Sequence, residues 1–387
     1  MAAFLLGASG MFATMYSTQA ILPELGSAFG VDPAQAGLTV SAVVIAVAAG
    51  VWIWGPLSDR LGRRRTMITA SALLVVPTVA AGLASTFPQL LACRIAQGLC
   101  MPGLLAVGVP YVMEAFGAWL GGRAMGVYVS ALVAGGLIGR VGVAVVADEV
   151  GWRWGVGGLA VLPAAGALLM VRALPDTGPP ERSGARGGGL PAQLRNRTLL
   201  GIALAAGCLF FTFVGVFSYV VYRLQAPPFG LGGAASSLIF VLWLLGVVGP
   251  PAGRLADRVG WPRAALGAVV CMGAGLLLSL PALLATLVPA LALVTAAMFA
   301  GLTSLQLGVT EAVTSDRGAA SAVFFSVYYA CGAVGAFAPG LAWQAWGWPG
   351  VAGVGLAAVC AAAVLLGSTG QAKARRRRSR RARSEPA

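Results

Sequence analysis

The chain has 387 residues, of which 58% are hydrophobic and only 10% are charged. Soluble domains carry about 25% charged residues, so this composition excludes an ordinary soluble protein. The formal net charge is +14, and the sequence contains no histidine, which excludes histidine-based catalysis and histidine metal ligands. The six cysteines are scattered without metal-ligand spacing and no nucleotide-binding loop pattern occurs, so we expect no metal, no cofactor and no ATP-driven pump.

Apolar segments run along almost the whole sequence, each with about 20 residues, the length at which a helix crosses a hydrocarbon layer of about 30 Å. The first segment lacks a cationic start and a small-residue cleavage site, so we interpret it as a transmembrane helix rather than a signal peptide. We therefore expect an all-α membrane protein with twelve transmembrane helices. The segments are 2–23, 36–55, 66–86, 88–113, 124–146, 152–171, 198–221, 231–250, 264–281, 285–310, 318–342 and 346–366.

A short basic turn separates the second and third apolar segments, and a near copy of it lies in the other half of the chain. Residues 55–65 read GPLSDRLGRRR, and residues 253–263 read GRLADRVGWPR. The offset between them is 198 residues, about half the chain, which indicates two related halves. The matching positions are Gly55, Leu57, Asp59, Arg60, Gly62 and Arg65 with Gly253, Leu255, Asp257, Arg258, Gly260 and Arg263.

The turn at residues 55–65 resembles the G-x-L-x-D-R-x-G-R-R signature between helices 2 and 3 of major facilitator superfamily (MFS) transporters. Residues 253–263 resemble its degenerate twin between helices 8 and 9. The resemblance implies two pseudo-symmetric six-helix bundles that rock between inward-open and outward-open states, with these turns as a conformational gate. The alternative is a solvated basic loop that only fixes topology. The gate residues carried over are Gly55, Asp59, Arg60, Gly62, Arg63, Arg64, Gly253, Asp257, Arg258 and Gly260.

A second internal match supports the same division of the chain. The pair Gly151-Trp152 before the sixth segment corresponds to Gly347-Trp348 near the twelfth, at an offset of 196 residues. Between the halves lies a stretch rich in proline, glycine and arginine, which is typical of a flexible linker. The expected domains are a six-helix bundle at 1–171, a cytoplasmic linker at 172–197, a second six-helix bundle at 198–367 and a basic disordered cytoplasmic tail at 368–387.

The distribution of basic residues predicts the orientation in the membrane. If the N-terminus is cytoplasmic, 22 of the 26 basic residues lie in cytoplasmic loops and the tail, and only Arg153 and Arg223 lie on the opposite side. We therefore expect a multi-pass protein of the cell (inner or plasma) membrane with both termini in the cytoplasm. The basic tail is expected to lie against anionic lipid headgroups and not to bind nucleic acid. Lys373 is the only lysine, a bias that suggests a GC-rich bacterial genome.

The fourth segment carries a charged residue inside the span. Residues 94–98 read RIAQG, which resembles the R-x-x-Q-G element on the fourth helix of MFS drug:proton antiporters. The resemblance implies that Arg94 faces the cavity and takes part in coupling, with Gln97 beside it. An arginine near mid-membrane costs about 2.5–3.5 kcal/mol on insertion scales, so we expect it not to face lipid unpaired. The alternative is an arginine that snorkels toward the surface.

The fifth segment repeats this feature with Arg140 in the glycine-rich run AGGLIGRVG at residues 134–142. The run occupies the place of the helix-5 signature of antiporters but lacks its Gly-Pro pair. Two deep arginines favour an anionic or neutral polar substrate over a lipophilic cation, because a buried charge requires a partner. For the other polar and aromatic candidates the alternative is a packing or interface role; they are Gln19, Tyr219, Trp243, Gln306 and Tyr328.

Carboxylates are absent from the middle of the predicted spans. All twelve lie at span ends, in loops or in the tail, and Glu24 comes nearest to a span interior. Glu114 and Glu311 occupy equivalent ends of the fourth and tenth segments, at an offset of 197 residues. Our hypothesis is that Glu114 pairs with Arg63 or Arg64 and latches the cytoplasmic side shut in the outward-open state.

These features together predict a secondary active transporter that moves a small molecule by alternating access. The antiporter-like element favours proton-coupled efflux, with protons as the coupling ion. The alternatives are an importer of a small metabolite, or a membrane sensor that has this fold but does not transport. Paired catalytic carboxylates, a nucleophile–base set and a metal constellation are absent from the sequence, so we do not expect an enzyme. The expected partners are the substrate and membrane lipid, and the expected state is a monomer.

Overall fold

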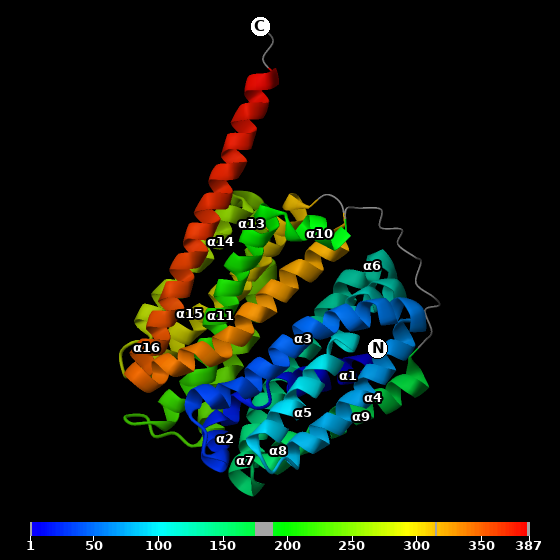
Figure 1. The fold of residues 1–387 in the computed structure, drawn as a ribbon, viewed down its shortest axis with the longest axis vertical. Coiled ribbons are helices and arrows are strands. Elements are labelled where there is room, and N and C mark those ends of the chain that lie inside the picture. The colour runs from blue at the N-terminus through cyan, green and yellow to red at the C-terminus, as the bar shows by residue number, and fades with distance from the viewer. Residues whose placement is uncertain (1, 175–188, 314–315, 385–387) are drawn as a thin grey trace. The chain divides into compact units, whose positions relative to one another are not determined.

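The computed structural model describes the backbone of residues 2–174, 189–313 and 316–384 (Figure 1). Side chains are described for the same residues apart from 106, 109–110, 113–125, 189–190, 317 and 368–384. Every regular element in these ranges is a helix. Most of the predicted linker between the halves, residues 175–188, lies outside the described chain.

The first half of the chain forms a series of helices that are joined by short turns, which places consecutive helices side by side. Several of the expected spans are built from more than one element. The elements are α1 (Ala2–Met15), η1 (Gln19–Ile21), α2 (Leu22–Phe29), α3 (Pro33–Leu61), α4 (Arg63–Gly82), α5 (Phe87–Cys100), α6 (Pro102–Leu137), the π-helical η2 (Ile138–Gly142), α7 (Val143–Val150), α8 (Trp152–Gly158) and α9 (Val161–Ala173).

The second half follows the same plan with a long 3₁₀ stretch in place of part of one helix. Its elements are α10 (Gly189–Leu194), α11 (Arg197–Gln225), α12 (Gly233–Ser237), the 3₁₀-helical η3 (Leu238–Val248), α13 (Gly249–Val259), α14 (Trp261–Leu278), α15 (Leu284–Ala312) and α16 (Arg317–Ser384). Helix α16 is two helices that meet at a kink at Gly347, and it continues to Ser384, where the sequence predicted no regular structure. Alanine and arginine favour helix there.

The structure divides into two compact units that do not coincide with the two halves of the sequence. Unit 1 consists of the described residues of Met1–Gly184, Val214–Leu244 and Ala333–Val351, and unit 2 consists of those of Ala185–Phe213, Leu245–Gly332 and Ala352–Ala387. In unit 1, α1 packs against α6 and α9, and α3 packs against α5. In unit 2, α14 packs against α15, and α13 contacts both. All of α12 and parts of α11, η3 and α16 therefore belong to the unit that contains the first half.

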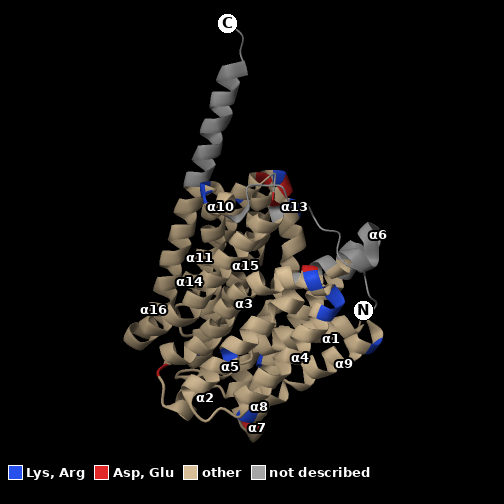
Figure 2. Cartoon of the chain, turned by 45° about the vertical axis from the view of Figure 1, so that its right-hand side comes forward, with Lys and Arg blue, Asp and Glu red and all other residues tan. Residues whose placement is uncertain are grey.

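Nine helical stretches of the described chain are long and apolar enough to cross a membrane. Three differences explain why this number is below the twelve predicted spans. The first span breaks after Met15, the fourth breaks between α5 and α6, and the last two are continuous through Gly347. Figure 2 shows the cartoon almost entirely tan, with Lys, Arg, Asp and Glu gathered near helix ends such as those of α7, α9 and α13.

The internal duplication is also visible in the backbone. Gly62 and Gly260, which match in the two basic turns, have φ angles of 80° and 89°. Gly151 and Gly347, which match at the two later corners, have φ angles of 100° and 59°. These angles lie in a region that other L-residues rarely adopt, so glycine is required for the sharp turn between consecutive helices. The equivalence read from the sequence is thus confirmed at the level of backbone conformation.

Candidate functional site

Arg94 lies on α5 in the interior of unit 1 and has no exposed surface. Its Nε donates a hydrogen bond to the Thr39 carbonyl at 3.0 Å, its Nη1 donates to the Thr14 carbonyl at 2.9 Å, and its Nη2 donates to the Met15 carbonyl at 2.6 Å. Nη1 also donates to the Gln97 side-chain oxygen at 2.7 Å. All three nitrogens are therefore engaged, and the side chain does not snorkel toward a surface.

The interruption of the first span explains this arrangement. Helix α1 ends at Met15, where the side chain of Ser17 donates to the Thr14 carbonyl at 3.0 Å and competes with continuation of the helix. The last carbonyls of a helix lack partners within it and carry the negative end of the helix dipole. The guanidinium of Arg94 supplies both the donors and the positive charge, so it caps the broken end of α1.

Gln97 and Gly98 add further contacts between α5 and the helices around Arg94. The Gln97 amide nitrogen donates to the Thr78 hydroxyl of α4 at 3.1 Å. A Cβ on Gly98 would lie 2.5 Å from the Val43 carbonyl oxygen, so only glycine permits the close approach of α5 to α3. The R-x-x-Q-G element thus holds α1, α3, α4 and α5 together through one turn of helix.

Arg140 lies on the π-helical element η2 and is only 1% exposed. Its Nε donates to the Gln19 side-chain oxygen at 2.9 Å, and its Nη1 donates to the Gly136 carbonyl at 2.8 Å. Its Nη2 is buried and has no hydrogen-bond partner among the residues that the structure describes. The carbon at the centre of the guanidinium lies 3.7 Å from the centre of the Trp243 ring. Short π-helical turns are frequent at functional sites.

The amide of Gln19 continues this contact into the second half of the sequence. Its nitrogen donates to the Ser218 hydroxyl of α11 at 3.2 Å, and both side chains have no exposed surface. Gln19 and Arg140 were both predicted as candidates, and the structure brings them together. Ser218 was not predicted, because nothing marks one serine in an apolar helix as a neighbour of a glutamine 199 residues away.

Glycines hold η2 and the C-terminal end of α6 against α1. A Cβ on Gly139 would overlap the Ala13 carbonyl, and a Cβ on Gly135 would overlap the Ser9 carbonyl. The Ser9 hydroxyl also donates to the Ala131 carbonyl at 2.8 Å. This contact fixes the depth of Arg140 relative to the broken end of α1, because the two backbones touch with no side chain between them.

First-half helices meet second-half helices at one end of unit 1, which we call the distal end: the N-terminal end of α3, away from the basic turn. The Ser41 hydroxyl donates to the Ala333 carbonyl at 2.6 Å. The Gln344 amide donates to the Asp32 carboxylate at 2.8 Å. The predicted candidate Tyr219, of the second half, lies within 3.4 Å of the Pro33 carbonyl of the first half and within 2.7 Å of the Ala336 carbonyl, to both of which its hydroxyl donates. In this structure the distal end is closed.

Two carboxylates also meet at the distal end. Asp148, near the end of α7, accepts a 2.7 Å hydrogen bond from the backbone N–H of Ala234. A Cβ on Gly233 would lie 2.6 Å from one Asp148 oxygen and 2.7 Å from one Glu24 oxygen, so both carboxylates face the same point. The second Glu24 oxygen, Oε2, is buried and accepts no hydrogen bond from the described part of the chain. This pairing across 124 positions of sequence was not predicted.

Burial raises the pKa of the Glu24 carboxyl above its ordinary value of 4.5; a backbone hydrogen bond opposes this, and the charge of Asp148 adds to it. The closed distal end therefore favours protonated Glu24. The stability that protonated Glu24 gives to the closed distal end is fully present below pH 4.5. It is lost as the pH rises through the raised pKa of Glu24.

We expect a rise in pH to open the distal end. With cysteine placed at the buried position Ser236, in a chain whose native cysteines are replaced, maleimide labelling should accelerate several-fold between about pH 5 and about pH 8, beyond the change in thiolate fraction. Glu24→Gln should flatten that dependence, whereas Glu149→Gln, an exposed neighbour, should leave it intact. A Glu24→Gln protein with the wild-type profile would contradict this expectation.

The basic turns lie at the other end of α3 and at the end of α13. Asp59 and Arg60 are exposed, as are Asp257 and Arg258. Arg64 donates to the carbonyls of Leu174 and Val171 at 2.7 Å and 2.6 Å, and so caps the end of α9. The predicted latch residue Glu114 lies outside the described side chains.

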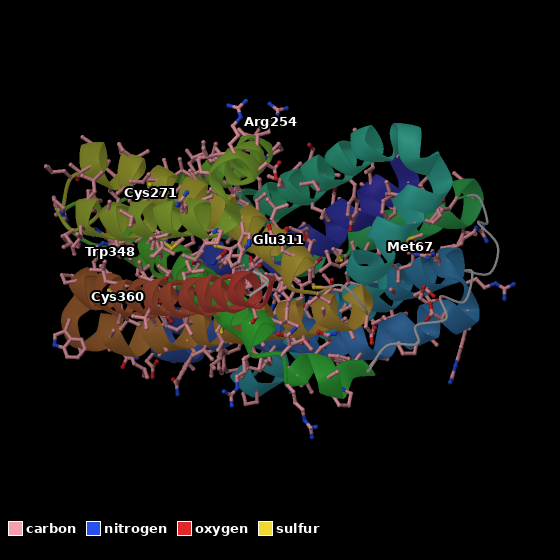
Figure 3. All side chains as sticks on the ribbon, turned by 90° about the horizontal axis from the view of Figure 1, so that it is seen from above. Met67, Arg254, Cys271, Glu311, Trp348 and Cys360 are labelled. Atoms are coloured by element: carbon pink, nitrogen blue, oxygen red, sulfur yellow. The ribbon has the colours of Figure 1, made fainter. Side chains whose placement is uncertain are left out.

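The second half shows what the equivalent positions do. Trp261, which corresponds to Arg63, donates its indole N–H to Glu311, which corresponds to Glu114, at 3.2 Å. Glu311 lies at the end of α15, and Arg254 extends outward from α13 (Figure 3).

The two remaining predicted candidates lie in unit 2. Gln306 is exposed on α15, and Tyr328 is stacked on Phe210 with ring centres 4.0 Å apart.

Comparison with known proteins places this architecture among transporters. The MFS-type transporter YybF of Bacillus subtilis is 28% identical over 357 residues, which is 91% of this chain and 88% of that protein. The inner membrane transport protein YnfM of Escherichia coli is 30% identical over 64% of this chain and 61% of that protein. The multidrug resistance protein MdtM of Escherichia coli is 29% identical over 43% of this chain and 41% of that protein.

Solved structures agree on the fold. A bacterial homologue of the human lysosomal transporter Spinster, in an inward-facing and occupied conformation, superposes with a TM-score of 0.74 over 95% of this chain and 96% of that chain, at 16% identity. The nucleoside transporter NupG gives the same TM-score at 15% identity, over 95% of this chain and 98% of that one. These likenesses confirm the predicted twelve-helix fold. The sequence model of the Major Facilitator Superfamily matches residues 3–336, and the chain therefore belongs to that superfamily of membrane transporters.

Proposed function

We propose that this MFS transporter exports a small molecule by alternating access and couples export to proton movement. The observation that carries the proposal is the closed distal end, where five hydrogen bonds that involve described side chains join first-half to second-half residues in unit 1. A typical hydrogen bond contributes about 0.5–1.5 kcal/mol net. A closure held by a few such bonds can separate and reform at modest cost, as a gate must.

The basic turns at residues 55–65 and 253–263 are the proposed second gate, at the opposite end of the spans from the distal end. We propose that this end faces the cytoplasm, together with both termini. The contact between Trp261 and Glu311 supports this role, because it shows that the position equivalent to Arg63 reaches the position equivalent to Glu114. The equivalent contact in the first half would join the guanidinium of Arg63 to the carboxylate of Glu114. Such a pair binds more strongly than an indole and a carboxylate. We propose that the Arg63–Glu114 pair holds this gate shut when the distal end opens.

The proposed direction is export. The R-x-x-Q-G element at residues 94–98 resembles that of drug:proton antiporters, and the similarity to MdtM over 43% of the chain supports the same direction. Glu24 and Asp148 are the proposed proton carriers, because their carboxylates face the same point at the closed distal end, where Glu24 is partly buried. We propose that the protein acts as a monomer in the cell membrane.

Reconstituted vesicles with an imposed pH gradient and a panel of labelled compounds test this function. Antiport predicts that at least one compound accumulates in vesicles with an acidic interior, and that dissipating the gradient with an ionophore abolishes the accumulation. Accumulation that instead follows protons inward would identify an importer. If no compound of the panel crossed in either direction while the protein was folded, the non-transporting sensor would be the better reading.

A further inference from the structure

We propose that Arg140 binds the negative charge of the substrate, and that the substrate class is an organic monoanion: one carboxylate or comparable oxyanion on an apolar body. This inference rests on the proposed transport function and names the substrate class for the same pathway. It starts from the different surroundings of the two buried arginines.

The positive charge of Arg94 is compensated by hydrogen-bond acceptors around it. Its guanidinium hydrogen-bonds three backbone carbonyls and the Gln97 side chain, and two of those carbonyls belong to the negative end of α1. Each of the three nitrogens of Arg94 is therefore already hydrogen-bonded. If Arg94 turned away to bind a ligand, the carbonyls at the broken end of α1 would lose their donors, at a cost of about 1–3 kcal/mol each.

Arg140 is not satisfied in this way. Among the described residues it hydrogen-bonds only the Gln19 amide oxygen and the Gly136 carbonyl, and no carboxylate pairs with it. The buried Nη2 remains without an acceptor. Burying a charge without a partner costs several kcal/mol, even after relaxation of the surroundings. Arg140 therefore presents both an unneutralised positive charge and a free donor.

The walls around Arg140 are aromatic. The guanidinium carbon lies 4.3 Å from the ring centre of Tyr16, 5.2 Å from that of Phe240 and 3.7 Å from that of Trp243. These rings stabilise the cation through their faces but cannot accept a hydrogen bond in the plane of the guanidinium. An oxyanion satisfies the in-plane donor, while the rings suit an apolar body attached to it.

The parts of this site come from both halves of the sequence. Arg140, Tyr16 and Gln19 belong to the first half, whereas Phe240, Trp243 and Ser218 belong to the second. Separation of the halves at the distal end would withdraw the second group from the first and expose the guanidinium. The site is closed when the distal end is closed, which places Arg140 where a transported anion must be held and released.

The charge of the site limits the charge of the ligand. One buried cation neutralises one negative charge, and a second negative charge would remain unpaired in surroundings of low dielectric constant. A monoanion is also driven outward by an inside-negative membrane potential, by about 2.3 kcal/mol per 100 mV. The proposed export of an anion therefore runs with the electrical gradient.

Binding to the purified full-length protein in detergent tests the inference by isothermal titration at about pH 7. The probes are three monoanions, each with a matched neutral form and two of them also with a cationic form: benzoate with benzamide and benzylammonium, octanoate with octanamide and octylammonium, and benzenesulfonate with benzenesulfonamide. We expect at least one anion to bind ten-fold or more tightly than its counterparts. Arg140→Gln should remove that preference, and Arg140→Lys should retain part of it. The control Arg153→Gln, at an exposed arginine, should leave it unchanged.

The selectivity of the unmodified protein decides the matter even if Arg140→Gln fails to fold. Neutral or cationic forms that bind as tightly as every anion would overturn the inference. An anion preference that survives in a folded Arg140→Gln protein would overturn the assignment of Arg140. A compound other than an anion transported in the vesicle screen would refute the substrate class while leaving the proposed function intact, whereas a failure of all transport would refute the function itself.

Discussion

Arg94→Ala is expected to destabilise the protein more than any other single replacement of a charged residue. It removes the donors that cap the broken end of α1 and leaves the Met15 carbonyl and the Gln97 side-chain oxygen without them. Hydrogen bonds to charged groups contribute about 1.5–3 kcal/mol each, so we expect a loss of roughly 3–5 kcal/mol in the free energy of unfolding. Thermal unfolding followed by tryptophan fluorescence in detergent measures this as a lower Tm.

The controls separate the capping role from a general effect of removing charge. Lysine at position 94 offers a single ammonium group in place of a planar fork, so Arg94→Lys should lie between the wild type and alanine. Arg153→Ala removes an exposed arginine that donates a 3.2 Å hydrogen bond to the Ala84 carbonyl, and it should change Tm little. An Arg94→Ala protein as stable as Arg153→Ala would show that Arg94 does not cap α1.

The sequence predicts the framework of this fold well, for physical reasons. Span length and hydrophobicity depend on local composition, and the basic turns repeat with the glycines that their backbone angles require, as Gly62 and Gly260 show. The two buried arginines are conspicuous because a charge inside an apolar span requires compensation. These features are local, so one sequence suffices to find them.

The surroundings of those arginines could not be predicted in the same way. Arg94 depends on a break after Met15, and a segment as apolar as residues 2–23 gives no local sign that its helix stops midway. Arg140 depends on Trp243 and on Gln19, which lie about 100 residues away on either side. Such contacts arise from the packing of helices against one another, and the sequence of a single span does not reveal which other helices it contacts. The difference in role between Arg94 and Arg140 therefore appears only in the structure.

Gly37→Leu is expected to abolish transport without unfolding the protein. Gly37 lies on α3 at the distal end, and a Cβ there would overlap the Ala336 carbonyl and lie 2.6 Å from the Tyr219 hydroxyl. A leucine cannot fit while the distal end is closed, but it meets no such obstacle once the halves separate there. Overpacking costs about 1–3 kcal/mol, and 1.4 kcal/mol is a factor of ten, so the closed population should fall about ten-fold or more.

Labelling from the distal side distinguishes a locked-open protein from an unfolded one. A cysteine at Ser218, which has no exposed surface in the closed structure, should become reactive to a membrane-impermeant maleimide in Gly37→Leu and remain protected in the parent. Gly353→Leu supplies the matched control, because that glycine is exposed and a Cβ on it meets nothing within 4 Å. If Gly37→Leu kept wild-type transport and a protected cysteine at position 218, closure of the distal end would not be a step of the cycle. Since alternating access requires each end to close in turn, that result would also remove the main support for the proposed mechanism.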